Sequence, residues 1–230
     1  MMMEVVYVAV AALSLLSVGQ SAPVTSCETL IQPLVIPGRD QLLGKWIYAA
    51  ESVTIPGARL LTDLLAGSAW SKMTSANESD AIDLVQVQST IDRCYSLRTK
   101  LTLQNSTLYM EHPYPAVVTL LNTGCSDCLV LFSRFTLGSA FSSLQLLSRR
   151  RGVSVAEKQE FLKQVECLNL PSPAFLDPEK GLCPDDSLSL GSETIDMTSA
   201  IDDLKSEWSS MLGNITSMIG LDTLLKLFSK

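Results

Sequence analysis

Short runs in which apolar and polar residues alternate occupy most of the chain between residues 44 and 148. The clearest run covers 95–103, where the apolar residues, among them Leu97 and Leu101, stand on odd positions. Strict alternation is the period of a half-buried β-strand. Turn-forming residues separate eight such runs. We place them at 44–50, around Trp70, and at 82–91, 95–103, 108–111, 116–121, 129–135 and 141–147.

Eight consecutive short antiparallel strands favour a closed up-and-down barrel, because closure removes the unpaired strand edges. A barrel of this size is filled by side chains or holds one small ligand. In the first strand, the period predicts Trp46, Tyr48 and Ala50 on one face. Segment 54–65 is interpreted as a loop with a short helical turn, because Pro56 interrupts its start.

The period changes after the last strand, where Ser154 and Glu157 form a capping box that opens a helix. Apolar residues then recur at helical spacing, at Phe161, Leu162, Val165 and Leu168. Such a stripe packs against a neighbouring apolar surface. The expected fold is therefore all-β, an eight-stranded up-and-down antiparallel barrel with one packed α-helix, followed by a C-terminal amphipathic helix.

The two ends of the chain differ from this central region. Residues 5–18 are almost wholly apolar and small residues follow, which is typical of a secretory signal and is short for a membrane span. We expect a signal peptide at 1–21, a barrel domain at 22–184, a polar linker at 185–194 and an amphipathic helix at 195–230. No transmembrane segment is expected in the rest of the chain.

The C-terminal segment carries apolar residues at alternating spacings of four and three. They are Met197, Ile201, Leu204, Trp208, Met211, Ile215 and Met218. This 3.5-residue repeat fits a helix that docks on the barrel, associates with a second helix, or lies on a lipid or lipoprotein surface. We favour binding to a lipoprotein particle or to a partner helix.

The charge and the cysteine count narrow the function. The formal net charge is −7, which argues against a nucleic-acid partner. All six cysteines follow the signal, and an even count in an exported chain indicates disulfides. With His112 as the single histidine and one C-x-x-C, at Cys125 and Cys128, we expect neither a metal nor a cofactor; those two cysteines predict a local disulfide. The lone histidine and the lack of G-x-S-x-G also argue against an enzyme.

Three glycosylation sequons begin at Asn77, Asn105 and Asn214. In a secreted chain they indicate exposed positions. Asn105 lies between two alternating runs, where a hairpin tip is expected.

Several short motifs together resemble the lipocalin family over residues 27–184. They are G-K-W-I-Y at 44–48, D-R-C-Y at 92–95, the sequon at 105–107, V-E-C-L-N-L-P at 165–171 and G-L-C-P at 181–184. Within that family the chain is similar to alpha-1-acid glycoprotein (orosomucoid), apolipoprotein M and the pufferfish saxitoxin- and tetrodotoxin-binding proteins. The resemblance implies a secreted carrier of a small molecule.

The resemblance also implies two long-range disulfides, Cys27–Cys167 and Cys94–Cys183. Each would close a long loop and stabilise the fold by about 3–5 kcal/mol. Cys125 and Cys128 then remain to pair with each other, because Gln159 occupies the position of the family's other partner cysteine.

Closure of the barrel base is a further implication of the resemblance. Lipocalins place an arginine from the end of the last strand over the tryptophan of G-x-W. Here Gly44 and Trp46 supply the motif, and Arg151 aligns best with the arginine, although Arg149 or Arg150 can serve instead.

Ligand contacts are expected from inward-facing residues toward the open end, and Tyr48 is the strongest candidate because its hydroxyl can orient a polar group. The full set is Tyr48, Trp70, Val85, Val87, Leu97, Leu101, Tyr109, Tyr114 and Phe135. The expected function is transport of a small hydrophobic or amphipathic molecule. The alternatives are sequestration of a cationic guanidinium toxin, or a lipoprotein-surface or partner interaction through 195–230.

Overall fold

The computed structural model describes residues 26–90, 93–177 and 181–185. The predicted signal at 1–21, nearly all of the predicted linker, the helix at 195–230 and the sequon at Asn214 lie outside the described residues. Among the helices of the described part, none is both long and apolar enough to cross a membrane.

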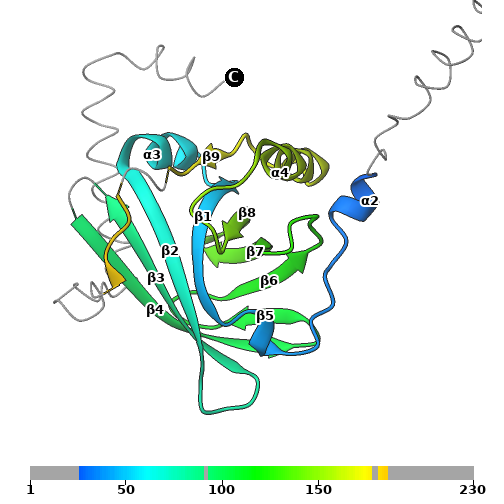
Figure 1. Cartoon of the computed structure of the whole chain (residues 1–230), viewed down its shortest axis with the longest axis vertical. Helices are drawn as coiled ribbons and strands as arrows, with labels where there is room; N and C mark the ends of the chain where they lie inside the picture. Colours follow the sequence, from blue (N-terminus) through cyan, green and yellow to red (C-terminus); the bar gives the residue numbers. More distant parts are fainter. Residues whose placement is uncertain (1–25, 91–92, 178–180, 186–230) are drawn as a thin grey trace, which may run out of the picture.

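Eight antiparallel strands form the barrel, as the sequence predicts (Figure 1). Each strand pairs with the next along the chain, and β1 pairs with both β8 and β2, which closes the ring. The strands are β1 (Gly44–Val53), β2 (Ala66–Ser75), β3 (Ala81–Thr90), β4 (Arg93–Gln104), β5 (Thr107–Met110), β6 (Ala116–Leu121), β7 (Cys128–Leu137) and β8 (Ser139–Ser148).

A β-bulge in β1 changes the direction of its side chains. The register against β8 shifts between Tyr48 and Ala50, so one extra residue, Ala49, is accommodated there. Before the bulge, Trp46 and Tyr48 face the barrel interior. After it, Ala50 faces the outer cluster under the long helix, and Glu51 turns inward toward Gln145. The prediction that Ala50 shares a face with Trp46 and Tyr48 is therefore wrong, because a bulge reverses the alternation.

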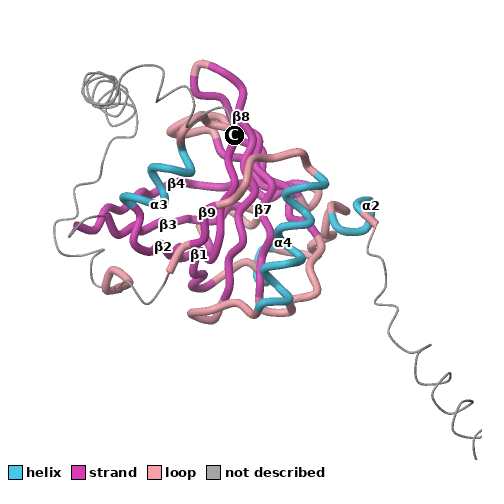
Figure 2. Tube along the Cα trace, turned by 90° about the horizontal axis from the view of Figure 1, so that it is seen from above, coloured by secondary structure: helices cyan, strands magenta, loops and turns pink. Residues whose placement is uncertain are grey.

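Helix α4 (Val155–Cys167) begins with the predicted capping box, in which Ser154 and Glu157 bond reciprocally. Figure 2 shows α4 outside the ring of strands. Phe161 and Val165 are buried against Ala50 and the outer faces of β6, β7 and β8. Leu162 is 37% exposed, so it does not belong to the packed stripe that the spacing predicts.

Three shorter helical segments and one short strand complete the described elements: α2 (Cys27–Leu30), the 3-10 turn η1 (Arg39–Gln41), α3 (Ala58–Leu65) and β9 (Ala174–Phe175), which pairs with β1 outside the ring. In α3, the segment interpreted as a loop with a helical turn forms an eight-residue helix. It joins β1 to β2 at one end of the barrel (Figure 1).

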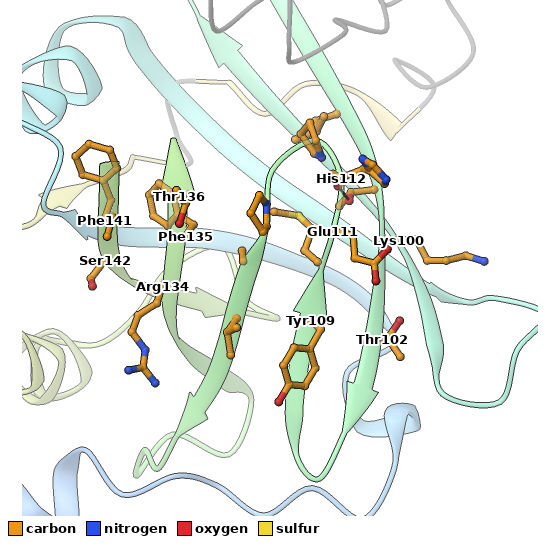
Figure 3. A pocket seen from close by; sticks show the side chains of 18 of the residues that line it. Lys100, Thr102, Tyr109, Glu111, His112, Arg134, Phe135, Thr136, Phe141 and Ser142 are labelled. Carbon is orange, nitrogen blue, oxygen red and sulfur yellow. Dashed lines mark hydrogen bonds between the residues drawn. The ribbon is translucent and has the colours of Figure 1, made fainter. Parts of the chain in front are cut away.

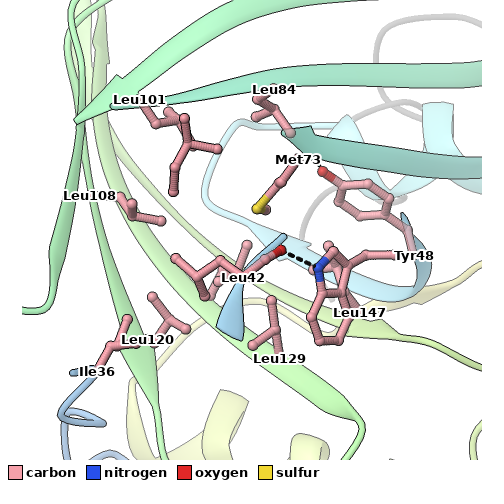
Figure 4. Close-up of a cluster of buried hydrophobic side chains, with 13 residues drawn as sticks. Ile36, Leu42, Tyr48, Met73, Leu84, Leu101, Leu108, Leu120, Leu129 and Leu147 are labelled. Carbon is pink, nitrogen blue, oxygen red and sulfur yellow. Dashed lines mark hydrogen bonds between the residues drawn. The ribbon is translucent and has the colours of Figure 1, made fainter. Parts of the chain in front are cut away.

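Apolar side chains from all eight barrel strands fill the half of the barrel near the start of β1 (Figure 4). The buried members include Leu42, Met73, Ile82, Leu84, Leu101, Leu108, Leu120, Leu129, Leu131 and Leu147. Trp46 anchors this core, since its indole N–H donates to the Leu42 carbonyl at 2.7 Å. Burial of each such leucine contributes about 1.5–3 kcal/mol.

Arg149, not Arg151, closes the base of the barrel. The guanidinium carbon of Arg149 lies 3.6 Å from the centroid of the Trp46 ring, and its two amino groups donate to the carbonyls of Leu43 and Lys45. Arg151 is exposed, so the prediction that it covers Trp46 is wrong. Arg149 directly follows β8, whose last residue pairs with Ile47, and this register brings it to the start of β1.

Three disulfides are present among the described residues, and they match the expected pairs. Cys27–Cys167 joins α2 to the end of α4, and Cys94–Cys183 ties the segment after α4 to β4. Cys125–Cys128 closes a turn before β7. Disulfides of this kind form in oxidising compartments.

The two sequons in the described residues stand on the hairpins at the closed end. Asn77 is exposed between β2 and β3, and Asn105 is exposed between β4 and β5. Asn105 and Ser106 have φ of 49° and 62°, the two positive values of a two-residue hairpin turn. The expected hairpin tip at Asn105 is confirmed.

The glycine at the start of β1 is required by Arg149. Gly44 has φ of 103°, and a Cβ at this position would lie 2.5 Å from Nη1 of Arg149. We expect Gly44→Ala to lower the free energy of unfolding by about 2–4 kcal/mol, through backbone strain and displacement of the guanidinium from Trp46. Denaturant unfolding with the disulfides intact measures this change.

Gly138→Ala is the matched control, since Gly138 has φ of 72° and a Cβ added there would meet no atom within 4 Å. It should cost about 1–2 kcal/mol, from backbone strain alone. Equal losses in the two variants would contradict the role given to the Arg149 contact.

Candidate functional site

The interior of the barrel changes from apolar to polar beyond Tyr48. Tyr48, Gln86 and Ser71 face inward from β1, β3 and β2, and Glu51 and Gln145 follow from β1 and β8. The Gln86 amide donates to the Tyr48 hydroxyl at 2.6 Å, and the Gln145 amide donates to the Glu51 carboxylate at 2.8 Å. These residues form what we term the polar cluster: Tyr48, Glu51, Gln86 and Gln145.

The barrel interior shifts the protonation of this cluster. Burial raises the pKa of Tyr48 to about 12, the Gln86 hydrogen bond opposes that rise, and the nearby charge of Glu51 adds to it. Burial also raises the pKa of Glu51 above its ordinary value, while the Gln145 hydrogen bond lowers it. Tyr48 is buried and Glu51 is half-buried, so the surroundings oppose the charged form of both groups.

Three aromatic rings form a row that begins in the turn before β6 and continues on β7 and β8. Tyr114, in the turn between β5 and β6, lies 5.6 Å from Phe135 between ring centroids, and Phe135 lies 5.9 Å from Phe141. Burial raises the pKa of Tyr114, and the charge of Glu51 raises it further. We call Tyr114, Phe135 and Phe141 the aromatic row.

A cavity of about 1410 Å³ opens at the rim beside this row (Figure 3). Inward-facing residues such as Leu97, Phe135 and Phe141 line part of it. Tyr109 and Arg134, which face outward, line another part. The short strand β5 pairs only with the last residues of β4. The cavity therefore extends across the sheet edge that the earlier part of β4 leaves unpaired on this side.

The polar cluster is not part of the lining of this cavity. Phe135 and Phe141 line the cavity, and the ring of Tyr114 lies against Phe135. Two rings of the aromatic row therefore border the rim cavity, and no residue of the polar cluster does. His112 also lines the rim and is exposed.

The nine predicted contact residues divide into three groups. Tyr48, Tyr114 and Phe135 lie in the polar cluster or the aromatic row. Leu97 lines the cavity and Leu101 belongs to the inner core, whereas Tyr109 lines the cavity from the outer face and is 40% exposed.

Trp70, Val85 and Val87 make up the third group and face outward, so the prediction that they point into the barrel is wrong. Trp70 and Val87 pack with Ile47 and Cys183, and the Trp70 indole donates to the Cys183 carbonyl at 2.9 Å. The register of β2 and β3 instead turns Met73 and Leu84 inward.

Sequence reasoning missed Glu51, Gln86, Gln145 and Phe141. Gln86 could have been found, because it continues the inward positions of Ile82 and Leu84 along β3. Glu51 could not, since its direction depends on the bulge at Ala49.

A second group of polar side chains lies outside the barrel. Ligand atoms of Cys125, Asp127, Cys128 and Glu157 lie within 4.8 Å of one another. The two cysteines form a disulfide, and Arg150 pairs with both carboxylates. The pairing with Arg150 lowers the pKa of Asp127, so this cluster serves as a structural ion-pair network.

Comparison with known proteins supports the fold. No family model matches the sequence, and no curated protein matches it. A solved structure, described as "The Siderocalin Ex-FABP functions through dual ligand specificities", matches with a TM-score of 0.54 and 18% identity. The match covers 60% of this chain and 95% of that one. The chain has a lipocalin-like fold. In this lipocalin-like barrel, Trp46 and Arg149 close one end, and the polar cluster lies toward the other.

The raised pKa of Tyr48 makes the free energy of unfolding fall as the pH rises into the alkaline range. Below pH 10 the hydroxyl is neutral in both states; between its ordinary value of 10.0 and about 12, only the unfolded chain releases the proton. The stability linked to neutral Tyr48 is therefore complete below pH 10 and is lost as pH rises toward about 12. From about pH 9 to 11, wild-type protein should lose about 1 kcal/mol more than Tyr48→Phe.

Denaturant unfolding at the two pH values measures the difference, and Tyr109→Phe is the control because Tyr109 is exposed. The Tyr109→Phe variant should follow wild-type protein. If Tyr48→Phe also follows wild-type protein, the hydroxyl of Tyr48 is not held neutral by the barrel.

Proposed function

We propose that the protein is a secreted glycoprotein that binds and carries a small hydrophobic or amphipathic molecule in its barrel. The transport would resemble that of orosomucoid and apolipoprotein M, the group to which the sequence motifs are similar. The observation that carries the proposal is the combination of a half-filled barrel, an aromatic row and a polar cluster. Binding sites for small molecules are mostly apolar and contain a few polar groups that fix orientation.

The arrangement of the barrel supports this function in two ways. The leucine-rich core fills the end closed by Trp46, so a ligand would be held above it rather than pass through. Phe135 and Phe141 line the rim cavity and offer apolar surface at its inner side. A molecule with an apolar body and one polar group matches these two surfaces.

Replacing one ring of the aromatic row tests the proposal. Phe135→Ala should weaken saturable binding of the neutral fluorescent probe Nile red about ten-fold, because a buried phenyl contributes about 1.5–3 kcal/mol. Fluorescence titration of the full chain measures the affinity. The matched control is Phe175→Ala, whose ring is 40% exposed outside the barrel in β9 (Ala174–Phe175).

The control variant should bind Nile red as wild-type protein does. No saturable binding by wild-type protein to Nile red or to other lipid, steroid and drug-like probes would overturn the proposed function. Equal weakening by both variants would show that the probe binds elsewhere.

Sequestration of a cationic guanidinium toxin is the second candidate. The formal net charge of −7 favours attraction of cations, and the sequence resembles the pufferfish toxin-binding proteins. Equilibrium dialysis against saxitoxin and tetrodotoxin separates this function from transport of neutral lipids, since absence of retention removes it.

The interaction of residues 195–230 with a lipoprotein particle or a partner helix remains a prediction from the heptad pattern, because that segment lies outside the described residues.

A further inference from the structure

The wall of the barrel is lowest at β5 and β6. These strands have four and six residues, whereas each of the other barrel strands has ten or twelve. The regular wall therefore stops at Met110 and begins again at Ala116. The turn at 111–115 joins them, and the Thr99 hydroxyl of β4 donates to the His112 carbonyl in this turn at 2.5 Å. The rim cavity lies along this low wall, because the turn and both strand ends line it.

Four of the side chains that line the cavity form a row across the outer face of this wall. The register pairs Thr102 with Tyr109, and Tyr109 with Val117. Val117 in turn pairs with Arg134 on β7. Side chains directly opposite one another on a sheet face are close enough to interact. We call these four residues the outer row, and Figure 3 shows Thr102, Tyr109 and Arg134 in line across the strands.

The outer row faces away from the barrel interior. Leu108, the neighbour of Tyr109 on β5, belongs to the inner core, so Tyr109 stands on the opposite face. The two central members, Tyr109 and Val117, offer apolar surface between the polar side chains of Thr102 and Arg134. The Tyr109 side chain is 40% exposed, so its ring is accessible to a ligand.

The cavity joins this outer surface to the inner one. Phe135 and Phe141 of the aromatic row line it from inside, and the outer row lines it from outside. Its volume of about 1410 Å³ exceeds the roughly 300–1,000 Å³ of typical ligand pockets. The leucine-rich core fills the barrel below. An apolar chain too long for the inner part therefore has space only across the low wall.

We propose that the outer row is a second subsite of the barrel, and that Tyr109 sets the length of apolar chain that the protein prefers. The ligand class is a straight-chain amphiphile. Its polar end and the first part of its chain bind inside, along the aromatic row. The rest of a long chain crosses the low wall and covers Tyr109 and Val117, which a short chain does not reach. This inference rests on the proposed function, because it adds a subsite to the same cavity.

The test compares two neutral probes with the same hydroxyl group, 1-octanol and 1-dodecanol. Displacement of Nile red from the full chain with its disulfides intact gives both affinities, once the Nile red affinity of each variant is known. Wild-type protein should bind dodecanol at least about ten-fold more tightly than octanol, since each fully buried methylene strengthens binding about four-fold. Tyr109→Ala should weaken dodecanol about ten-fold and octanol less than about two-fold.

Two control variants bracket this result. Phe175→Ala removes a ring that is also 40% exposed on a short strand, but Phe175 does not line the rim cavity, so neither affinity should change. Phe135→Ala changes the inner part of the cavity and should weaken both alcohols. Equal weakening of the two alcohols by Tyr109→Ala, or an unchanged dodecanol affinity, would overturn the role of the outer row.

A second variant covers the case in which Tyr109→Ala fails to fold. Val117→Ala should weaken dodecanol about three-fold and leave octanol unchanged, because Val117 lies beside Tyr109 on the outer face. Equal affinity of wild-type protein for the two alcohols would overturn the inference without any variant. Absence of saturable Nile red binding would instead overturn the proposed function. Saturable Nile red binding without a selective effect of Tyr109→Ala or Val117→Ala leaves the carrier function standing and removes only the outer subsite.

Discussion

The barrel depends on β1 because this strand pairs with two neighbouring strands, β2 and β8. Its first residues pair with β2 from Gly44 to Ile47, and its length from Ile47 to Val53 pairs with β8. Every other pairing in the barrel joins strands that follow one another in the chain, so the pairing of β1 with β8 is the non-local contact that turns an up-and-down sheet into a ring. Contacts between strands so far apart in sequence form only after much of the chain has been ordered. The pairing of β1 with β8 is therefore the contact that closes the barrel.

The base of the barrel strengthens that contact where it begins. Trp46 lies under the guanidinium of Arg149, which comes from just beyond β8 and bonds to the carbonyls of Leu43 and Lys45. One side chain thus links the first and last strands. Burial lowers the pKa of Arg149, but an arginine stays charged across the physiological range, so this link does not depend on ordinary changes of pH.

Sequence patterns predicted the number of strands, the capped helix and the cysteine pairs, because each of these depends on local spacing or on motifs. The sequence patterns did not predict the directions of individual side chains as well. Trp70, Val85 and Val87 were expected inside, yet the register of β2 and β3 turns them outward. Alternation gives two equivalent faces, and only the register to neighbouring strands decides which face is inside. The choice of Arg149 over Arg151 likewise follows from the place where β8 stops pairing with β1.

The segment after α4 covers strand edges that remain unpaired although the barrel is closed. Beyond Ile47, β1 and β2 separate, and each would present unpaired backbone groups. The segment after Pro171 covers β1, because β9 pairs with Ala50 and Glu51 and the Leu176 N–H donates to the Ala49 carbonyl. On β2, the hydroxyl of Ser68 donates to the Gly181 carbonyl at 2.7 Å. An exposed strand edge is a template for aggregation. By bonding to both strands, the segment that follows the helix leaves fewer unpaired backbone groups to which a second barrel could bind.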